Sequence, residues 1–189
     1  MDAIASIEEF VSWEDILENR FSKPRTVEIG GFYISEKCLK MEGLMERKPL
    51  LFEEAATFAD YCDATDRVLK EFGTRLPTED ELEAAFGGDL FPWGSELPDG
   101  VPYKSETSFK RHHLPGHKGL VYNSDPYKTE LTRSALKLGD GGESICGSYP
   151  WPMAWLALSQ AYRISPSELD DSDALYDFMN DAEVRQVRL

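Results

Sequence analysis

The sequence predicts an α+β domain whose second half consists mainly of loops and short strands. Helical patterns dominate as far as about residue 86, whereas past Gly94 only short strand candidates interrupt long stretches without periodicity. The 11 Pro and 14 Gly among 189 residues favour a loop-rich fold over a helical bundle. The length indicates one domain, and an apolar fraction of 41% is typical of a folded protein.

The N-terminal segment is predicted to be helical. Ser6 and Glu9 have the spacing of a capping box, and Pro24 ends the segment. Its apolar residues share one helix face, namely Ile7, Phe10, Val11, Ile16 and Leu17. We therefore expect residues 1–25 to form a helical segment that packs on a single domain spanning residues 26–189.

Two further elements are predicted before residue 70. Thr26 to Ser35 read as a strand, because apolar residues alternate along it across a bulge or turn at Gly30-Gly31. Pro49 to Thr65 have helical spacing of apolar residues, which predicts a helix over this range.

The segment from Arg75 to Gly88 predicts a capped helix. Thr78 and Glu81 form a capping box, and the acids at positions 79–81 lie at the positive end of the helix dipole. Leu82, Ala85 and Phe86 supply the buried stripe, and Gly87-Gly88 ends the helix.

Short strands are expected in the second half at Gly119–Tyr122, Ser144–Tyr149 and Val184–Leu189. Between the first two, Gly139-Asp140-Gly141-Gly142 indicates a tight turn that leads into the next strand. Phosphate binding is not predicted there, because the turn lacks a following helix and a Lys-Ser/Thr pair.

The charge is strongly negative and unevenly distributed. The net charge is −15, and seven acidic residues lie between Arg163 and Arg185, including Asp170, Asp171 and Asp173. This balance disfavours nucleic acids and anionic membranes as partners. Two interpretations stay open for the acids: an ordinary solvated surface, or a docking face for a basic protein.

The chain from about Thr26 onward resembles the formylglycine-generating (sulfatase-modifying factor) family. The specific match is Arg75-Leu76-Pro77-Thr78-Glu79-Asp80-Glu81-Leu82-Glu83-Ala84-Ala85, followed by Gly87-Gly88 and Phe91-Pro92-Trp93-Gly94. Weaker matches follow in family order at residues 26–34, 59–62, 118–123, 146–149, 161–163 and 184–189. The resemblance implies a C-type-lectin-like α+β fold.

The resemblance also places the family's chemistry on this chain. Family oxidases hold copper with two thiolates just after a G-G-S-W motif, since soft sulfur ligands suit Cu(I). Cys146-Gly147-Ser148-Tyr149 occupies the motif, and the two thiolate positions fall on Trp151 and Leu156. We therefore expect no catalytic residue, no bound metal and no cofactor. The family's calcium segment is also replaced, at residues 125–131.

Other candidate sites receive structural interpretations. His112, His113 and His117 are interpreted as surface histidines, because basic neighbours disfavour a metal cation. The acidic run at 170–173 lacks the Gly and the later Glu of a calcium loop. Cys62 and Cys146 are expected to be buried as small apolar residues.

The aromatic residues near the copper motif leave two alternatives open. Tyr149, Trp151 and Trp155 either fill the core, or plug the family's cleft and convert it into an apolar binding patch. With Asp170, Asp171 and Asp173 they form the predicted binding site of a non-catalytic acidic module, in an inhibitor, immunity or accessory role. The alternative is an oxidoreductase of the family or a descendant enzyme.

The cellular setting follows from the cysteines and the N-terminus. Three cysteines without metal-like spacing favour a reducing compartment. Residues 1–10 show no basic residue followed by an apolar core, and no apolar run reaches the length of a membrane span. We expect a cytoplasmic protein, and the sequence assigns no oligomeric state.

Overall fold

Short helices surround a centre of very short strands in the computed structural model, which describes residues 13–97, 119–121, 127–146, 151–169 and 172–189. The helical elements are α2 (Trp13–Arg20), α3 (Met41–Arg47), α4 (Pro49–Phe52), α5 (Phe58–Lys70), α6 (Glu79–Phe86), α7 (Glu143–Cys146), α8 (Trp151–Leu156), the 3-10 turn η2 (Pro166–Glu168) and α9 (Ser172–Asp181). The strands are β1 (Tyr33–Ile34), β2 (Leu39–Lys40), β3 (Glu130–Leu131), β4 (Leu136–Lys137), β5 (Arg163–Ile164), β6 (Glu183–Val184) and β7 (Val187–Arg188).

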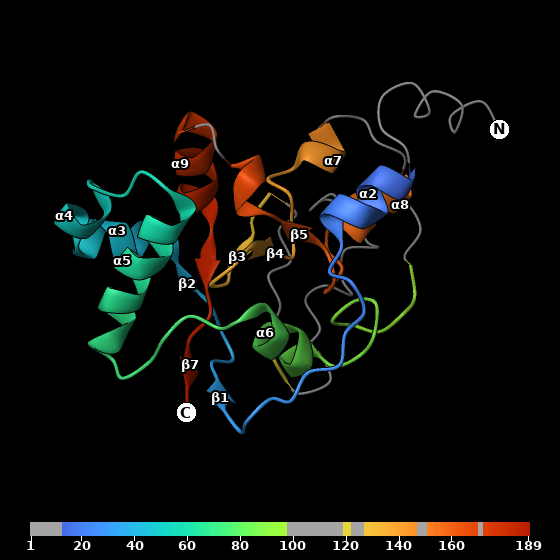
Figure 1. Ribbon diagram of the computed structural model, residues 1–189, viewed down its shortest axis with the longest axis horizontal. Helices are drawn as coiled ribbons and strands as arrows, with labels where there is room; N and C mark the ends of the chain where they lie inside the picture. Colours follow the sequence, from blue (N-terminus) through green and yellow to red (C-terminus); the bar gives the residue numbers. More distant parts are fainter. Residues whose placement is uncertain (1–12, 98–118, 122–126, 147–150, 170–171) are drawn as a thin grey trace.

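The strands form two sheets that the C-terminal segment joins. The larger sheet has the order β2-β6-β3-β4-β5, and only the β3–β6 pair in it is parallel. The smaller sheet pairs β1 with β7 in an antiparallel manner. Because β6 and β7 are separated by two residues, the C-terminal strand segment ties both sheets together (Figure 1).

The buried apolar residues form two clusters. The larger cluster joins α3, α5 and α9 to the sheet and contains Met41, Val68, Leu69 and Met179 among its fully buried members. The smaller cluster lies between α6 and α8 and includes Phe86 and Trp155. Figure 1 shows α3, α4 and α5 on one side of the strands and α2 and α8 on the other. The prediction of a mixed helical and strand architecture is confirmed. The prediction that the second half consists mainly of loops and short strands is wrong, because α7, α8 and α9 all lie there.

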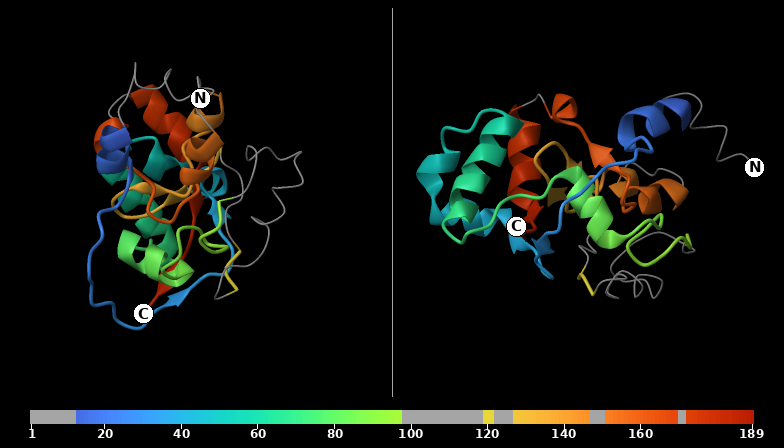
Figure 2. Two further views of the ribbon diagram at one scale, coloured as in Figure 1. Left: turned by 90° about the vertical axis from the view of Figure 1, so that its right-hand side faces the viewer. Right: turned by 60° about the horizontal axis from the view of Figure 1, so that its bottom comes forward.

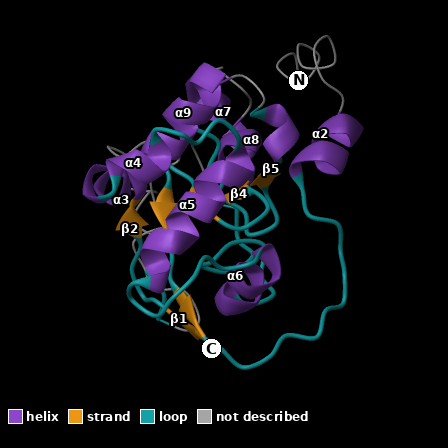
Figure 3. Cartoon of the chain, turned by 60° about the vertical axis from the view of Figure 1, so that its left-hand side comes forward, coloured by secondary structure: helices purple, strands orange, loops and turns teal. Residues whose placement is uncertain are grey.

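The segment that follows α2 runs along the outside of the molecule before it reaches β1 (Figures 2 and 3). It is attached near its start, where the Ser22 N–H donates to the Ala161 carbonyl at 2.7 Å. The rings of Phe21 and Tyr162 meet edge to face with their centroids 5.6 Å apart. These contacts hold α2 beside the second half of the chain.

The predicted strand over Thr26–Ser35 is mostly wrong, because only Tyr33–Ile34 forms a strand. Only these two residues find a partner strand, in β7, and a strand needs such a partner for its backbone groups. Val27, one of the alternating apolar residues, is exposed.

The predicted helix over Pro49–Thr65 is divided into α4 and α5. Thr57 begins the second helix, because its hydroxyl accepts from the Asp60 N–H while the Asp60 carboxylate accepts from the Thr57 N–H. This capping box stops a continuous helix from forming across residues 53–57.

The predicted strand over Ser144–Tyr149 is also wrong over its described part. Residues 143–146 form α7, because Asp140 accepts hydrogen bonds from the N–H groups of Gly142 and Ser144 and so caps the helix. Residues 119–121 form no strand either, although the Val121 N–H donates to the Glu36 carbonyl. Tyr122 and residues 147–149 lie outside the described residues.

The prediction of strand structure over Val184–Leu189 is correct, but the predicted length is not. Val184–Leu189 contains β7 and the end of β6 rather than one strand. Arg185 interrupts the strand, because its side chain turns inward to bind Glu130 in the core.

Candidate functional site

The capped helix predicted from Thr78 is confirmed in α6. The Thr78 hydroxyl accepts from the Glu81 N–H at 3.2 Å, and the Glu81 carboxylate accepts from the Thr78 N–H at 2.9 Å. Arg75 donates to both oxygens of the same carboxylate, at 2.7 and 2.6 Å. The hydrogen bond from Arg75 is the main reason that the pKa of Glu81 lies below its usual range.

The other acids of α6 are neutralised by cations of the same chain. The Lys137 side chain is fully buried (0% exposed), and its ammonium contacts Glu83 at 2.7 Å and Glu79 at 3.7 Å. Arg163 contacts Glu79 at 3.1 Å. Burial lowers the pKa of Lys137, although the two carboxylates oppose that shift. We call Glu79, Glu83, Lys137 and Arg163 the α6 charge network.

A groove of about 470 Å³ lies beside the α6 charge network. Arg25, from the segment that follows α2, binds Asp80 and contacts Glu83 at 3.1 Å along this groove. The Ser22 hydroxyl donates to Glu83 at 2.8 Å. The acids of the family-like segment therefore attach the N-terminal segment to the domain, which is a structural role.

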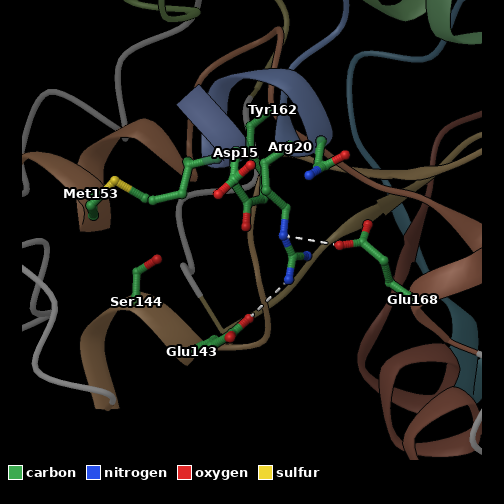
Figure 4. A pocket seen from close by; sticks show the side chains of 9 residues that line it. Asp15, Arg20, Glu143, Ser144, Met153, Tyr162 and Glu168 are labelled. Atoms are coloured by element: carbon green, nitrogen blue, oxygen red, sulfur yellow. Dashed lines mark ion pairs between the residues drawn. The ribbon is translucent and has the colours of Figure 1, made fainter. Parts of the chain in front are cut away.

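A second cavity, of about 240 Å³, lies between α2 and the start of α7 and α8 (Figure 4). Its lining combines acidic and apolar side chains from distant parts of the sequence, namely Asp15, Ile16, Asn19, Arg20, Glu143, Ser144, Met153, Tyr162 and Glu168. Ile16 fixes the position of α2 beside this cavity, because its side chain is buried against the domain while the neighbouring residues face solvent.

Carboxylates outnumber cations around this cavity. Arg20 lies between Glu143, at 3.5 Å, and Glu168, at 3.0 Å (Figure 4). With Asp15 the lining has three carboxylates to one guanidinium. We use the name acidic end for Asp15, Glu143 and Glu168 together with Asp177 and Asp181 on the neighbouring α9.

The polar residues of the cavity form no pair of nucleophile and general base within the described residues. The Ser144 hydroxyl donates to Asp140, but this carboxylate also accepts from the N–H groups of Gly142 and Ser144. Asp140 therefore acts as the helix cap of α7. Burial raises the pKa of Tyr162, so its hydroxyl stays protonated.

The predicted aromatic site is only partly described. Trp155 is fully buried (0% exposed), and its ring meets the Trp93 ring edge to face with the ring centroids 6.1 Å apart. Trp155 therefore fills the core. An exposed patch that includes Trp155 does not fit this position. Leu156 is half-buried on the same helix. Tyr149 and the side chain of Trp151 lie outside the described residues.

The predicted acidic and histidine sites fall mainly outside the described residues. Asp170 and Asp171 are among these, as are His112, His113 and His117. Asp173 belongs to the first turn of α9, but its side chain is not described. Glu168, two residues before Asp170, lies at the acidic end.

Sequence reasoning missed Asp15, Arg20 and Glu143. Asp15 and Arg20 both belong to α2, whereas Glu143 lies more than 120 residues later in the chain and meets them only because α2 packs beside α7. The sequence contained one indication of a role for Arg20, since it is the sole basic residue in the acidic stretch that forms α2.

The cysteines differ in their surroundings. Cys62 is buried as expected, its thiol donates to the Thr132 carbonyl at 3.5 Å, and burial raises its pKa to about 12. Cys146, expected to be buried, is exposed instead, because residues 143–146 form a surface helix rather than a core strand. Within the described ranges no three His, Cys, Asp or Glu side chains are grouped to hold a metal ion.

No described helix combines the length and the apolar character that a membrane crossing requires. Comparisons of the chain with family models, curated proteins and solved structures found no match.

Proposed function

We propose that the chain is a non-catalytic, cytoplasmic domain of formylglycine-generating-enzyme-like, C-type-lectin-like fold that binds a basic protein through its acidic end. An inhibitor, immunity or accessory role is the concrete form of this function. The family-like segment supports the assignment of the fold, and its residues have the capping and ion-pair roles that a scaffold helix needs.

One observation carries the binding function: acids from separate segments gather at the same end of the molecule. Asp15, Glu143 and Glu168 surround one cavity, and Asp177 and Asp181 line a pocket on the adjoining α9. Figure 1 shows α2, α7 and the start of α9 toward the same edge of the molecule, and α9 runs inward from there to β6. Such a surface attracts cationic groups and raises their association rate.

The residues at the family's thiolate positions support a non-catalytic role. Leu156 and Trp151 offer no soft ligand for copper, and both lie on α8. Trp155 on the same helix is part of the core. The helix therefore has the character of a packing element.

Capture of partners from the native source tests the proposal. Tagged wild-type protein is compared with the variant Asp15→Asn, Asp177→Asn, Asp181→Asn, which removes three carboxylates of the acidic end. We expect a basic protein to bind the wild type at low salt. The binding should be lost in the variant and at about 0.5 M salt, where exposed charges are screened.

A charge-matched variant separates local from general electrostatics. The control variant removes the same amount of charge from exposed positions on α3 and just after α4, through the changes Glu42→Gln, Glu46→Gln and Glu53→Gln. This control should retain the partner. Equal retention by all three proteins, or retention that salt does not alter, would contradict the proposal.

An oxidoreductase is the second candidate, and the exposure of Cys146 favours it. Its sulfur is accessible and lies 3.5 Å from the Tyr127 hydroxyl. Metal analysis of the purified protein distinguishes the two functions. Stoichiometric copper that disappears in Cys146→Ala would support the enzyme, whereas copper-free protein with a partner that depends on the acidic end supports the binding module.

A further inference from the structure

The helix α2 is attached to the acidic end through a single basic residue. The helix carries three acids, at positions 14, 15 and 18, and Arg20 is its only basic residue. The Arg20 side chain reaches from α2 to Glu143 on α7 and to Glu168 on η2 (Figure 4). An acidic helix is repelled by an acidic surface, so Arg20 supplies the electrostatic attraction that holds α2 there.

The apolar contacts of α2 are few. Ile16 is the only buried residue among the described side chains of the helix, and Leu17, its other aliphatic residue, is 54% exposed. A helix of eight residues is too short to be stable by itself in water. The position of α2 therefore depends on Ile16 and Arg20.

The contact between α2 and the domain is also incompletely filled. The cavity of about 240 Å³ lies beneath the helix, and Ile16, Met153 and Tyr162 are among the residues that line it. Protein interiors are close-packed and rarely leave a void larger than a water molecule. A cavity of this size at the contact indicates that α2 is not locked onto the domain.

The chain just after α2 is held more firmly and provides a pivot. Phe21 and Tyr162 form an antiparallel bridge, and the Ser22 N–H donates to the Ala161 carbonyl at 2.7 Å. The Lys137 ammonium donates to the Ser22 hydroxyl at 3.0 Å. None of these contacts involves a residue of α2, so the helix can move while residues 21 and 22 stay in place.

The carboxylates that bind Arg20 can be reached from solvent. The side chains of Glu143 and Glu168 are 52% and 27% exposed, whereas Lys137 in the α6 charge network is fully enclosed. The Glu168 carboxylate is also fixed in position, because one of its oxygens accepts from the Ser165 N–H at 2.7 Å. A basic side chain of another protein can therefore compete with Arg20 for the same two carboxylates.

We propose that α2 is an internal competitor of the basic partner: Arg20 occupies the acidic end until a basic side chain of the partner displaces it, and α2 then swings about residues 21 and 22. This regulation rests on the proposed function, since it acts on the same surface. The partner binds the open state more tightly and so shifts the equilibrium toward it. The apparent affinity is lowered by the fraction of molecules that are closed.

Binding of a labelled oligolysine peptide to the whole chain, followed by fluorescence anisotropy, tests the competition. Arg20→Gln should bind the peptide about fivefold more tightly than the wild type, because α2 loses its ionic contacts. Arg67→Gln removes the same charge from an exposed position on α5 and should stay within about twofold of the wild type. Equal tightening in the two variants would show a general effect of charge and overturn the proposal.

A second pair of variants loosens α2 without a change of charge. Ile16→Ala removes the buried contact of the helix and should tighten peptide binding by about threefold. Leu17→Ala, at the exposed neighbouring position, should leave the affinity within about twofold of the wild type. An unchanged affinity in Ile16→Ala would contradict a competing helix.

Hydrogen exchange observes the movement itself in the wild type. A saturating concentration of the peptide should speed the exchange of the α2 amides, whereas the amides of the buried α5 should keep their protection. Unchanged exchange in α2 upon peptide binding would overturn the proposal.

The same titrations separate this regulation from the proposed function. Peptide binding that is weakened by Asp177→Asn, Asp181→Asn, but is equal in the wild type, Arg20→Gln and Ile16→Ala, would overturn the regulation and leave the proposed function intact. Absence of peptide binding in all of these proteins would contradict the proposed function and the regulation with it.

Discussion

Acidic residues around α6 and acidic residues at the acidic end are arranged in opposite ways. In the α6 charge network each carboxylate meets a cation of the same chain, and Lys137 is fully enclosed. At the acidic end Arg20 is shared by Glu143 and Glu168, and Lys128 contacts only one of the two acids of the α9 pocket. The difference teaches that acids and cations are closely matched around α6, whereas acids outnumber the cations that contact them at the acidic end, where we propose that a partner binds.

Two lysines give the largest expected contrast between the regions. Lys137→Met should lower the free energy of unfolding by about 3 kcal/mol, because it leaves Glu79 and Glu83 without their buried cation. Lys128→Met should change it by about 0.5 kcal/mol or less, since its ion pair with Asp181 is long and partly exposed. Urea unfolding measures both values. Similar losses in the two variants would erase the contrast.

Acid titration sharpens the same comparison with a smaller effect. The folded-state pKa of Glu81 is lowered, so the unfolded chain binds the proton more tightly and the carboxylate stabilises the fold when it is ionised. This stabilisation is complete above the unfolded pKa of about 4.3 and is lost as the pH falls through the lower folded value.

The variant Glu81→Gln should therefore have a flatter dependence of stability on pH below about 4.3 than the wild type has. Glu42→Gln, at an exposed position of α3, serves as its control and should keep the wild-type slope. Urea unfolding at several acidic pH values measures the slopes. An unchanged slope in Glu81→Gln would show that Arg75 does not hold this carboxylate ionised.

Local chemistry predicted the parts of the fold that depend on neighbouring residues. Thr78 and Glu81 define the start of α6 through a capping box that lies within four residues, and the structure forms it as expected. The same rule applies to Thr57 and Asp60. The prediction did not take their capping box into account, and this box explains why the predicted helix over residues 49–65 is divided into two. The strand over residues 26–35 failed because pairing depends on β7, which lies at the far end of the chain.

The acidic end was predictable only in part. The excess of acids between Arg163 and Arg185 indicated the region, but its cavity needs Asp15 and Glu143, which tertiary packing supplies. Trp155 could not be assigned from the sequence either, because an aromatic residue near a motif fits a core and a binding patch equally well. The structure places it in the core.

Binding of a labelled oligolysine peptide, measured by fluorescence anisotropy at several salt concentrations, tests the central claim most directly. The wild type is compared with Asp15→Asn, Asp177→Asn, Asp181→Asn at the acidic end, and with Glu42→Gln, Glu46→Gln, Glu53→Gln elsewhere. We predict that the acidic-end variant binds about tenfold more weakly than the wild type, with a reduced dependence on salt. The other variant should stay within about twofold of the wild type. Equal weakening in the two variants would contradict a localised acidic binding surface.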